Sequence, residues 1–363
     1  MSTDCRPLLV DLRIPYCIRE EPFRMGLQLV GSNAEKNAYM AALKQELLSW
    51  EGELEGYEVP ALRLSGGSAT VMSPDLLGDL LRTAREILPL AQGAEVGVDA
   101  QPLTIGTPAL TGIAAGKPNR MELMMRAGSD EELRALGCPH TEQHVRNAVR
   151  FFSRFHLNNY GLTVDLGIPG QTGLSFHNTL RACTICHPAH IRIQCPDVRD
   201  AEGMPDGETR FAWYADACSF LKESGYLQYA AGDFCLPQHA SRYTLAELNG
   251  AEVLALGLGA VSLLDGYLTR STTHLPTYLA HAGDYEKTTA EVFSAGTDYL
   301  MRDYAAKRLR TPEGLSRESF EARFGCKLPA ELETELRARA GQALLTETPT
   351  SYVPTVRGLF TVL

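Results

Sequence analysis

Short apolar segments alternate with amphipathic helical patterns through the first two thirds of this chain. This alternation constrains the fold more than any other feature of the sequence. The predicted strands are Leu8–Ile14, Ala61–Gly67, 94–100, 120–125, 161–167 and His190–Cys195. Strands that are joined by helices pair in parallel, so the series predicts an α/β fold with a parallel sheet, either doubly wound or arranged as a barrel. In both arrangements ligands bind at the carboxyl ends of the strands.

Several helix starts are marked by capping residues. SNAE (Ser32–Glu35) reads as a capping box before a helix predicted over 33–50. Ser73 followed by Pro74 predicts the next helix start, and SDEE (129–132) predicts another.

The pattern changes after Asp197, where a polar loop rich in Gly and Pro precedes a helix predicted over 210–224. From about Leu236 onward the segments look mainly helical. The tail predicts a short helix, a charged helix and a hairpin closed by a final turn, which is the outline of a winged helix. We therefore expect two domains, 1–235 and 236–363.

Charge and hydropathy narrow the classes of partner. The net charge is −10 and no basic run occurs, so we expect neither a nucleic acid nor a membrane as partner. The N-terminus does not read as a secretory signal, and the longest nearly apolar run, 253–264, is too short to span a bilayer. Nine cysteines are too few for a disulfide scaffold of this length, so we expect reduced thiols and a cytoplasmic location.

A series of short motifs follows the predicted strands in a fixed order. They are IPYC (Ile14–Cys17), SGGSA (Ser65–Ala69), DAQP (Asp99–Pro102), NRMELMMR (Asn119–Arg126), LGCPH (Leu136–His140), GIPGQT (Gly167–Thr172), HIRIQ (His190–Gln194), GYLQYAAGDFCLP (Gly225–Pro237) and LGLGA (Leu256–Ala260). In order and spacing they resemble the radical S-adenosylmethionine superfamily, in particular its anaerobic coproporphyrinogen III oxidase and heme-chaperone branch. The resemblance implies a partial (β/α)6 barrel at 1–235, followed at 236–363 by a helical extension and a small winged-helix-like C-terminal domain.

The first motif departs from that family where its chemistry begins. The family's IPFCxxxCxYC supplies three thiolates to a 4Fe–4S cluster, whose fourth iron takes S-adenosylmethionine. This chain keeps only Cys17 and has Glu21 and Arg24 at the other two positions. A carboxylate is a hard ligand, and an arginine has no lone pair to offer, so a conventional cluster is not expected. We expect Glu21 and Arg24, spaced i and i+3, to pair with each other instead.

The positions that hold S-adenosylmethionine in the family are also altered. The resemblance assigns cofactor contact to Gly66, Gly67, Ser68, Asp99, Arg126, Asp165 and Gly170. The glycines have a second interpretation as strand-end packing. Further family positions carry Asp11, Cys138 and Thr163, and Asp165 would share a face with Thr163. The chaperones' HNxxYW segment is replaced by ASRYTLAE (240–247), with His239 alone upstream.

The most metal-like spacing in the chain is CTICHPAH (Cys183–His190). It spans a predicted helix end and a strand start, which places it at the opposite end of the barrel from the expected site. We therefore interpret it as buried thiols and a turn histidine. Cys195 ends the sixth strand on the same face as Cys17, and a shared ligand between them stays open.

The resemblance predicts a degenerate relative, a pseudoenzyme that acts as a binding or regulatory protein in a tetrapyrrole-related context. Its ligand would be a small anion or tetrapyrrole held by Arg13, Arg24 and Arg126, or its partner a protein. S-adenosylmethionine remains open as a ligand, and heme is open without a supporting motif. Two alternatives stand beside this one. One is an active radical oxidoreductase that uses unorthodox ligands, Cys17 with Cys138, Cys195 or Cys235, and the other is a cluster-free enzyme dependent on S-adenosylmethionine.

Overall fold

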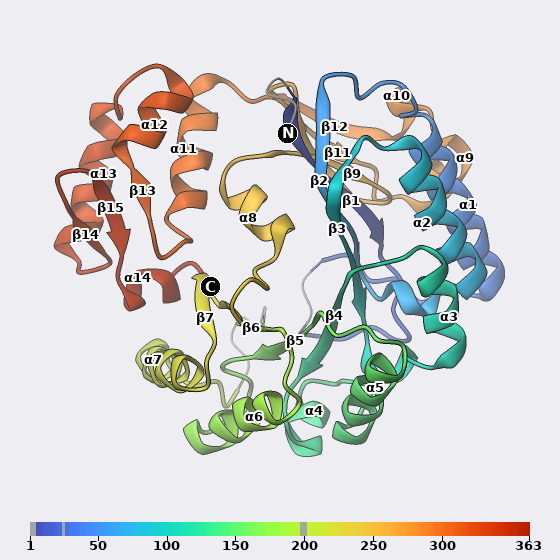
Figure 1. The fold of residues 1–363 in the computed structure, drawn as a ribbon, viewed down its shortest axis with the longest axis horizontal. Helices are drawn as coiled ribbons and strands as arrows, with labels where there is room; N and C mark the ends of the chain where they lie inside the picture. The colour runs from blue at the N-terminus through green and yellow to red at the C-terminus, as the bar shows by residue number, and fades with distance from the viewer. Residues whose placement is uncertain (1–4, 24–25, 197–201) are drawn as a thin grey trace.

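The structure is a computed structural model that describes residues 5–23, 26–196 and 202–363. Within these residues, twelve strands form one mixed sheet in the order β12-β11-β10-β9-β1-β2-β3-β4-β5-β6-β8-β7, and three more form a second sheet, β13-β15-β14. Figure 1 shows the large sheet curving around α8, with α1 to α7 on its outer side.

The predicted alternation of strands and helices is confirmed. The parallel strands are β1 (Arg6–Ile14), β2 (Tyr57–Gly66), β3 (Leu90–Ala100), β4 (Arg120–Arg126), β5 (Tyr160–Asp165) and β6 (His190–Gln194). The helices are α1 (Asn33–Leu48), α2 (Pro74–Ile87), α3 (Thr107–Ala115), α4 (Asp130–Ala135), α5 (Glu142–Arg154), α6 (Gly173–Ile185) and α7 (Gly207–Glu223). Most predicted boundaries fall within a few residues of these.

Helix starts largely follow the capping signals. Ser32 and Ser129 each accept a hydrogen bond from the backbone three residues on. This is one half of the capping box predicted at Ser32; the Glu35 side chain accepts from the Tyr16 hydroxyl at 3.1 Å. Ser73 precedes α2 but its side chain makes no capping hydrogen bond, so Pro74 in the first turn is the stronger start signal there.

The strands have two different faces, because successive side chains of a strand point in opposite directions. In β1, Leu8, Val10, Leu12 and Ile14 are buried in the large core that the outer helices cover. Asp11 points the other way and forms an ion pair with Arg63 of β2 inside the curve of the sheet. The apolar core therefore lies outside the barrel, and the barrel interior is polar.

The expectation of a mainly helical segment after Leu236 is wrong for residues 252–294. After β7 (Leu227–Ala230), β8 (Asp233–Cys235) and α8 (Arg242–Leu248), the chain forms β9 (Glu252–Leu256), β10 (Val261–Leu264), β11 (Tyr267–Ser271) and β12 (Thr289–Ser294), with α9 (Leu275–His281) and α10 (Tyr285–Thr288) between the last two strands. β9 pairs in parallel with β1, so this segment extends the barrel sheet.

A hairpin signal marked these strands in the sequence. Asp265 and Gly266 lie between β10 and β11 and both have positive φ, 49° and 77°, as a tight hairpin turn requires. The run 253–264 itself contains most of β9 and all of β10, with a turn between them. Its apolar composition alone could not distinguish these strands from a buried helix.

Most of the last 67 residues pack around a core of their own, whereas Phe360 and Leu363 pack against the main core. They contain α11 (Thr297–Arg308), β13 (Leu315–Ser316), α12 (Arg317–Phe324), α13 (Ala330–Gly341), β14 (Leu345–Glu347), β15 (Ser351–Pro354) and α14 (Val356–Phe360). The order helix, helix, hairpin and final turn is the one indicated by the sequence, and its winged-helix character stays a prediction, as does the boundary at 235.

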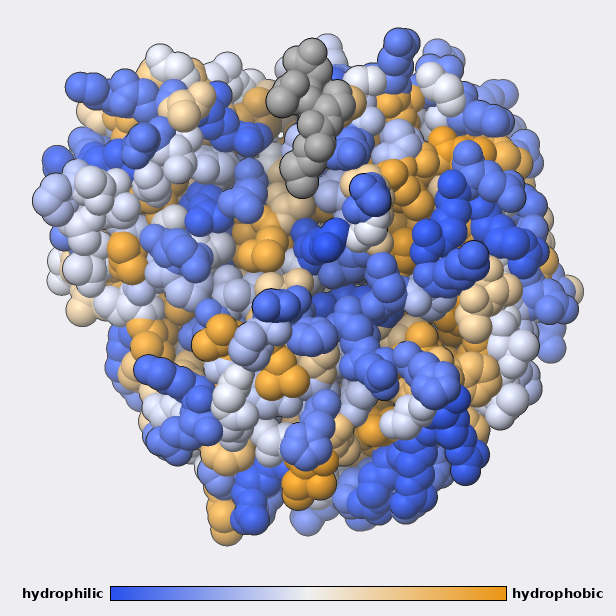
Figure 2. Space-filling model, in the orientation of Figure 1, coloured by the Kyte–Doolittle hydropathy of each residue, from blue (hydrophilic) through white to orange (hydrophobic). Residues whose placement is uncertain are grey.

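The face of the molecule that is turned to the viewer in Figure 1 is largely polar. Figure 2 shows hydrophilic residues over much of this face, including its centre, with apolar residues scattered between them. In the part of the chain that the structure describes, no helix is both long and apolar enough to cross a bilayer.

Candidate functional site

The loop that follows β1 folds back over the carboxyl ends of the strands. The Gln28 amide is bound to the backbone of Glu21 in both directions, at 2.9 and 3.1 Å. The backbone amide of Cys17 donates to the carbonyl of Leu29 at 2.9 Å. These bonds fix where the loop places the Cys17 and Glu21 side chains, both of which are buried.

A buried ion-pair network lies where the loop meets the strand ends. The Arg126 guanidinium, at the end of β4, lies 2.9 Å from the Glu21 carboxylate through Nη1 and 2.5 Å from the Asp165 carboxylate through Nε. Its Nη2 donates to the carbonyl of Phe23 at 2.9 Å. Arg126, Glu21 and Asp165 are at most 4% exposed, so the network is closed to solvent.

Two amides complete the coordination of these carboxylates. Gln101 Nε2 donates to Glu21 Oε1 at 2.7 Å, and Gln194 Nε2 donates to Asp165 Oδ1 at 2.8 Å. Asp165 is completely buried, which raises its pKa against the opposing effect of Arg126. Arg126 is thus held between two carboxylates, and each carboxylate has a second donor. We call Glu21, Gln101, Arg126, Asp165 and Gln194 the strand-end network.

The predicted pairing of Glu21 with Arg24 cannot be assessed, because Arg24 lies outside the described residues. The expected anion-binding role of Arg126 meets a different arrangement from the one assumed, since its guanidinium already faces two carboxylates. Arg13, the third arginine of that group, ends β1 on the inner face, and its Nε is buried without a hydrogen-bond partner among the described residues.

The two glycines after β2 pack against the loop itself. A Cβ on Gly67 would lie 2.3 Å from the carbonyl oxygen of Tyr16, and one on Gly66, whose φ is +98°, would lie 2.8 Å from the Arg13 side chain. Ser68 is buried and bonded to Thr70 at 2.8 Å. The close approach at this strand end is therefore between two segments of the chain, which supports the packing interpretation of these glycines.

Gly170 lies in the loop before α6. It has positive φ, 75°, and a Cβ there would meet no described atom within 4 Å. Its amide donates to the carbonyl of Gly203 at 3.0 Å. Gln171 holds this loop by accepting from the amide of Gly167 at 2.7 Å.

The donors at the loop do not fit an iron–sulfur cluster. Cys17 is the sole thiol at the three family positions, and the Glu21 carboxylate is already bound to Arg126. Cys138 is near the network, but burial raises the pKa of its thiol to about 12 although Arg126 pulls that pKa down. Burial thus makes Cys138 harder to deprotonate than an ordinary thiol, which disfavours it as a cluster thiolate. Among the described residues, no group of three metal-ligating side chains converges.

Most of the remaining cysteines lie apart from this network, although Cys195 directly follows Gln194 and is close enough to Asp165 to feel its charge. Cys183 of α6 packs in the outer core with its Sγ 3.5 Å from Met125 Sδ, and Cys186 caps the same helix. His190 lies on the inner face of β6, so the CTICHPAH residues point to different layers. Cys195 lines the barrel cavity, and Cys235 is buried in β8.

A polar cavity of 420 Å³ lies inside the barrel, next to the strand-end network. Its wall includes the inner-facing residues Arg63, Asp99, Glu122, Thr163 and Arg192, with Arg310 from the C-terminal part. Arg63 is paired with Asp11 and Arg192 with Asp233. Among the described residues, Arg310 forms no ion pair with a carboxylate.

Two of the predicted cofactor residues, Gly66 and Asp99, line this cavity, and Asp99 is the charged one. In the described part of the chain its carboxylate has no hydrogen-bond or ion-pair partner. Burial raises the pKa of Asp99 to about 6, and the neighbouring Glu122 and Asp11 add to the rise while Arg63 opposes it. A ligand that donates a hydrogen bond or carries positive charge could pair with this group.

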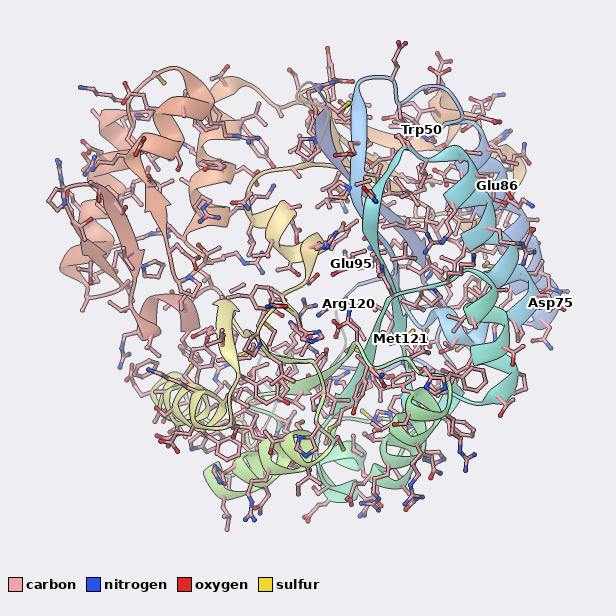
Figure 3. All side chains as sticks on the ribbon, viewed as in Figure 1. Trp50, Asp75, Glu86, Glu95, Arg120 and Met121 are labelled. Atoms are coloured by element: carbon pink, nitrogen blue, oxygen red, sulfur yellow. The ribbon has the colours of Figure 1, made fainter. Side chains whose placement is uncertain are left out.

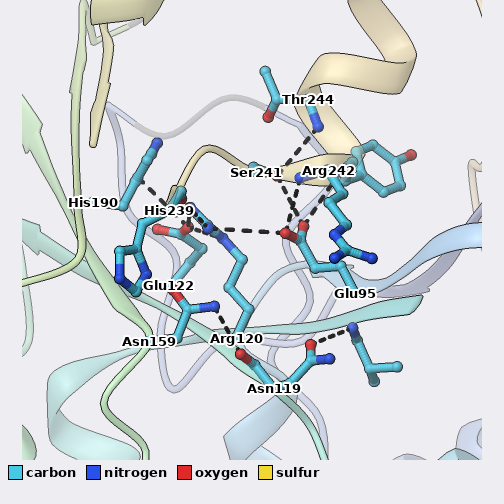
Figure 4. Close-up of polar contacts among 12 residues, drawn as sticks. Glu95, Asn119, Arg120, Glu122, Asn159, His190, His239, Ser241, Arg242 and Thr244 are labelled. Carbon is cyan, nitrogen blue, oxygen red and sulfur yellow. Dashed lines mark hydrogen bonds and ion pairs between the residues drawn. The ribbon is translucent and has the colours of Figure 1, made fainter. Parts of the chain in front are cut away.

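A second polar network lies at the amino ends of the barrel strands (Figure 4), and the sequence analysis did not predict it. Arg120 Nη2 lies 2.7 Å from Glu122, and Arg120 Nη1 donates to the carbonyl of His239 at 3.1 Å. Burial raises the pKa of Glu122, but Arg120 and His190 outweigh it and hold that pKa well below its usual range. The alternate polar residues of RMELMMR and HIRIQ were the available signal, because period two places them on one face.

The same network fixes α8 inside the barrel. Glu95 of β3 accepts from Ser241 Oγ at 2.9 Å, from the amide of Arg242 at 2.9 Å and from the amide of Tyr243 at 3.3 Å. The Tyr243 ring lies under the Arg63 guanidinium, 4.1 Å from ring centroid to Cζ. A carboxylate at the start of a helix is favourable, so Glu95 both caps α8 and ties it to the sheet.

The relatives of this chain agree with the resemblance read from its motifs. It is 23% identical over 277 residues to the heme chaperone HemW of Escherichia coli, covering 73% of each protein. It is 22% identical over 355 residues to the oxygen-independent coproporphyrinogen III oxidase of Bradyrhizobium diazoefficiens, covering 90% of this chain and 78% of that protein. No protein-family model matches the chain.

The fold has a close counterpart among solved structures. The structure of the Escherichia coli coproporphyrinogen III oxidase HemN, a radical S-adenosylmethionine enzyme, superimposes with a TM-score of 0.84 over 99% of this chain and 88% of that one, at 19% identity. The chain is thus related to these chaperones and oxidases and has the radical S-adenosylmethionine fold of HemN.

Proposed function

For this relative of the heme chaperones and coproporphyrinogen III oxidases, we propose a role in binding or regulation, without cluster-based radical chemistry, in a tetrapyrrole-related context. The observation that carries the proposal is the position of Arg126. Its guanidinium bridges Glu21 and Asp165, and Glu21 stands at the second cysteine position of the family motif. The chain's own side chains therefore fill the second cysteine position, and their charges compensate one another.

Radical chemistry in this family begins with an electron that the cluster delivers to S-adenosylmethionine. Without thiolate ligands that electron has no source, and no later step can follow. The barrel cavity, by contrast, is large enough to bind a ligand, because its volume of 420 Å³ is within the range of small-molecule pockets.

The ligand that we propose for the cavity is a carboxylate-bearing molecule, either a small anion or a tetrapyrrole. Arg63 and Arg192 line the wall and are balanced by carboxylates, while Arg310 has no carboxylate partner among the described residues. An unbalanced guanidinium at a cavity suits a carboxylate, which it can bind through two hydrogen bonds.

Binding can be tested by absorbance titration of the full chain with coproporphyrin III. We expect saturable binding that weakens about tenfold in Arg310→Gln, the loss of one charge-assisted contact. Arg339→Gln is the matched control, since Arg339 is exposed on α13 and does not line the cavity. Equal affinities for the two variants would remove the cavity from the proposal.

Titration with S-adenosylmethionine separates this proposal from the cluster-free enzyme. Tight binding in the absence of iron, lost in Asp99→Asn, would favour that alternative, because Asp99 is a buried carboxylate of the cavity wall that has no partner among the described residues. No saturable binding is the result that the proposal expects.

A further inference from the structure

A second cavity, remote from the barrel interior, combines acidic and aromatic residues. It has a volume of 440 Å³ and lies between the end of α1, the β10–β11 turn and α10. Its lining includes Glu46, Glu53 and Asp265 with Trp50 and Tyr285, and no Lys or Arg among the described residues. We call it the Trp50 pocket. Figure 3 shows Trp50 near α10, away from Glu95 and Arg120 of the barrel.

Two aromatic rings form one wall of the pocket. Trp50 and Tyr285 stand perpendicular to each other, with centroids 6.2 Å apart. Tyr285 is 52% exposed, which is high for a large ring that packs at the rim of a cavity. Rings at this angle can present a face to a bound group, and the face of an indole attracts organic cations most strongly among side chains.

A buried carboxylate lies opposite. Glu46 is 8% exposed, and its Oε2 accepts from the Tyr278 hydroxyl at 2.6 Å and from the amide of Gly257 at 2.9 Å. No described group donates to its Oε1, so one oxygen of the carboxylate is left for the pocket. Burial raises the pKa of Glu46 to about 7, although these hydrogen bonds oppose the rise. The two bonds thus offset only part of the cost of burying the negative charge.

The end of α1 adds to the negative field. The helix has 16 residues, an acidic residue in its first turn and no basic residue in its last turn. Its carbonyl end, at Ser49 and Trp50, borders the pocket. No basic side chain of the last helical turn neutralises the negative end of the helix dipole there. Asp265 is balanced by Arg6 at 2.8 Å, so Glu53 and the helix end carry the net charge, and Glu46 adds to it once the pH exceeds its pKa of about 7.

We propose that the Trp50 pocket binds an organic ammonium group, such as a trimethylammonium or alkylammonium head. Aromatic faces beside a partly free carboxylate are the features that recognise such a group. A metal ion is not favoured, because among the described residues no three ligating side chains converge. In addition, two of the five lining residues named above are aromatic and offer no metal-ligating carboxylate. The inference does not depend on the function proposed for the barrel.

The test uses Trp50 as its own reporter. The chain has two tryptophans, so Trp213→Phe leaves Trp50 as the single indole. Titration of this full-length variant with choline is compared with 3,3-dimethyl-1-butanol, which has the same shape without the charge. We expect a saturable change of Trp50 emission with choline and at least tenfold weaker binding of the neutral alcohol.

Variants assign the response to the pocket. Glu46→Gln and Tyr285→Leu should each weaken choline binding at least fivefold, whereas Glu51→Gln, an exposed neighbour outside the pocket, should not. Tyr285 is half exposed, so its variant stays informative if Glu46→Gln fails to fold. Equal responses to choline and the alcohol, no saturation, or unchanged binding in Tyr285→Leu would overturn the proposal.

Discussion

Arg126 and Glu21 are 105 residues apart in the sequence, and their side chains meet at 2.9 Å between Nη1 and Oε2 in a buried site at the carboxyl ends of the strands. Neither residue is the one that the related enzymes' motif would place there, and each compensates the charge of the other. Two departures from the family pattern, in different motifs, therefore form one interaction.

Removing the central arginine should destabilise the chain strongly. Arg126→Met leaves two buried carboxylates without their cation, which costs roughly 3–5 kcal/mol. Urea unfolding monitored by circular dichroism measures the loss. The triple variant Glu21→Gln, Arg126→Met, Asp165→Asn should recover most of it, because no uncompensated charge remains. Arg146→Met, which breaks an exposed pair with Glu142 on α5, should cost less than about 1 kcal/mol.

The cap of α8 should also be sensitive. Glu95→Ala removes the acceptor for three donors and leaves Arg120 with less compensation, so we expect a loss of about 2–4 kcal/mol. Glu86→Ala on the exposed face of α2, labelled in Figure 3, is the control and should lie within about 0.5 kcal/mol of the parent protein. Thermal unfolding compares the two, and equal midpoints would mean that Glu95 does not hold α8.

Asp99 should make stability depend on pH. Its pKa is about 6 in the folded chain and lies near 3.8 without the fold, so the folded chain binds the proton more tightly. The stabilising contribution is therefore complete below pH 3.8 and is lost as pH rises through about 6. Asp99→Asn should remove this component, raising the free energy of unfolding at pH 7 by about 1–3 kcal/mol relative to the parent chain and by less at pH 4.5. A parallel shift at both pH values would contradict the assignment.

Thiol reactivity should follow burial. Of the nine cysteines, Cys5 and Cys326 are exposed, whereas Cys17 and Cys138 are buried. Ellman's reagent should therefore label Cys5 and Cys326 first and the buried thiols only on unfolding, with the partly exposed thiols between them. Mass spectrometry identifies the labelled positions. Rapid labelling of Cys138 would be inconsistent with a buried thiol whose pKa is about 12.

Several parts of the structure could be predicted from residue patterns alone. The strand–helix alternation and the capping serines before α1 and α4 are local signals, and they located most barrel elements. The motif series gave the relationship to chaperones and oxidases, although each motif by itself is short.

Other features depend on contacts that no local pattern contains. The pair of Glu21 with Arg126 of β4 is one of them, and no spacing within the loop motif indicated it. β9 reads as part of an apolar run, yet it pairs with β1 from more than 240 residues away. Glu95 as the cap of α8 depends on the same kind of long-range placement. These contacts are set by the packing of the whole barrel, which overrides local propensity.

The central claim is that the strand-end network stands in the place of a cluster. Anaerobic reconstitution with iron and sulfide, followed by counting both per chain and recording the visible spectrum, tests it most directly. We predict no stoichiometric iron, and no spectral change between the parent chain and Cys17→Ala. About four irons per chain, lost in Cys17→Ala, would contradict the account and would identify an active cluster with a new set of ligands.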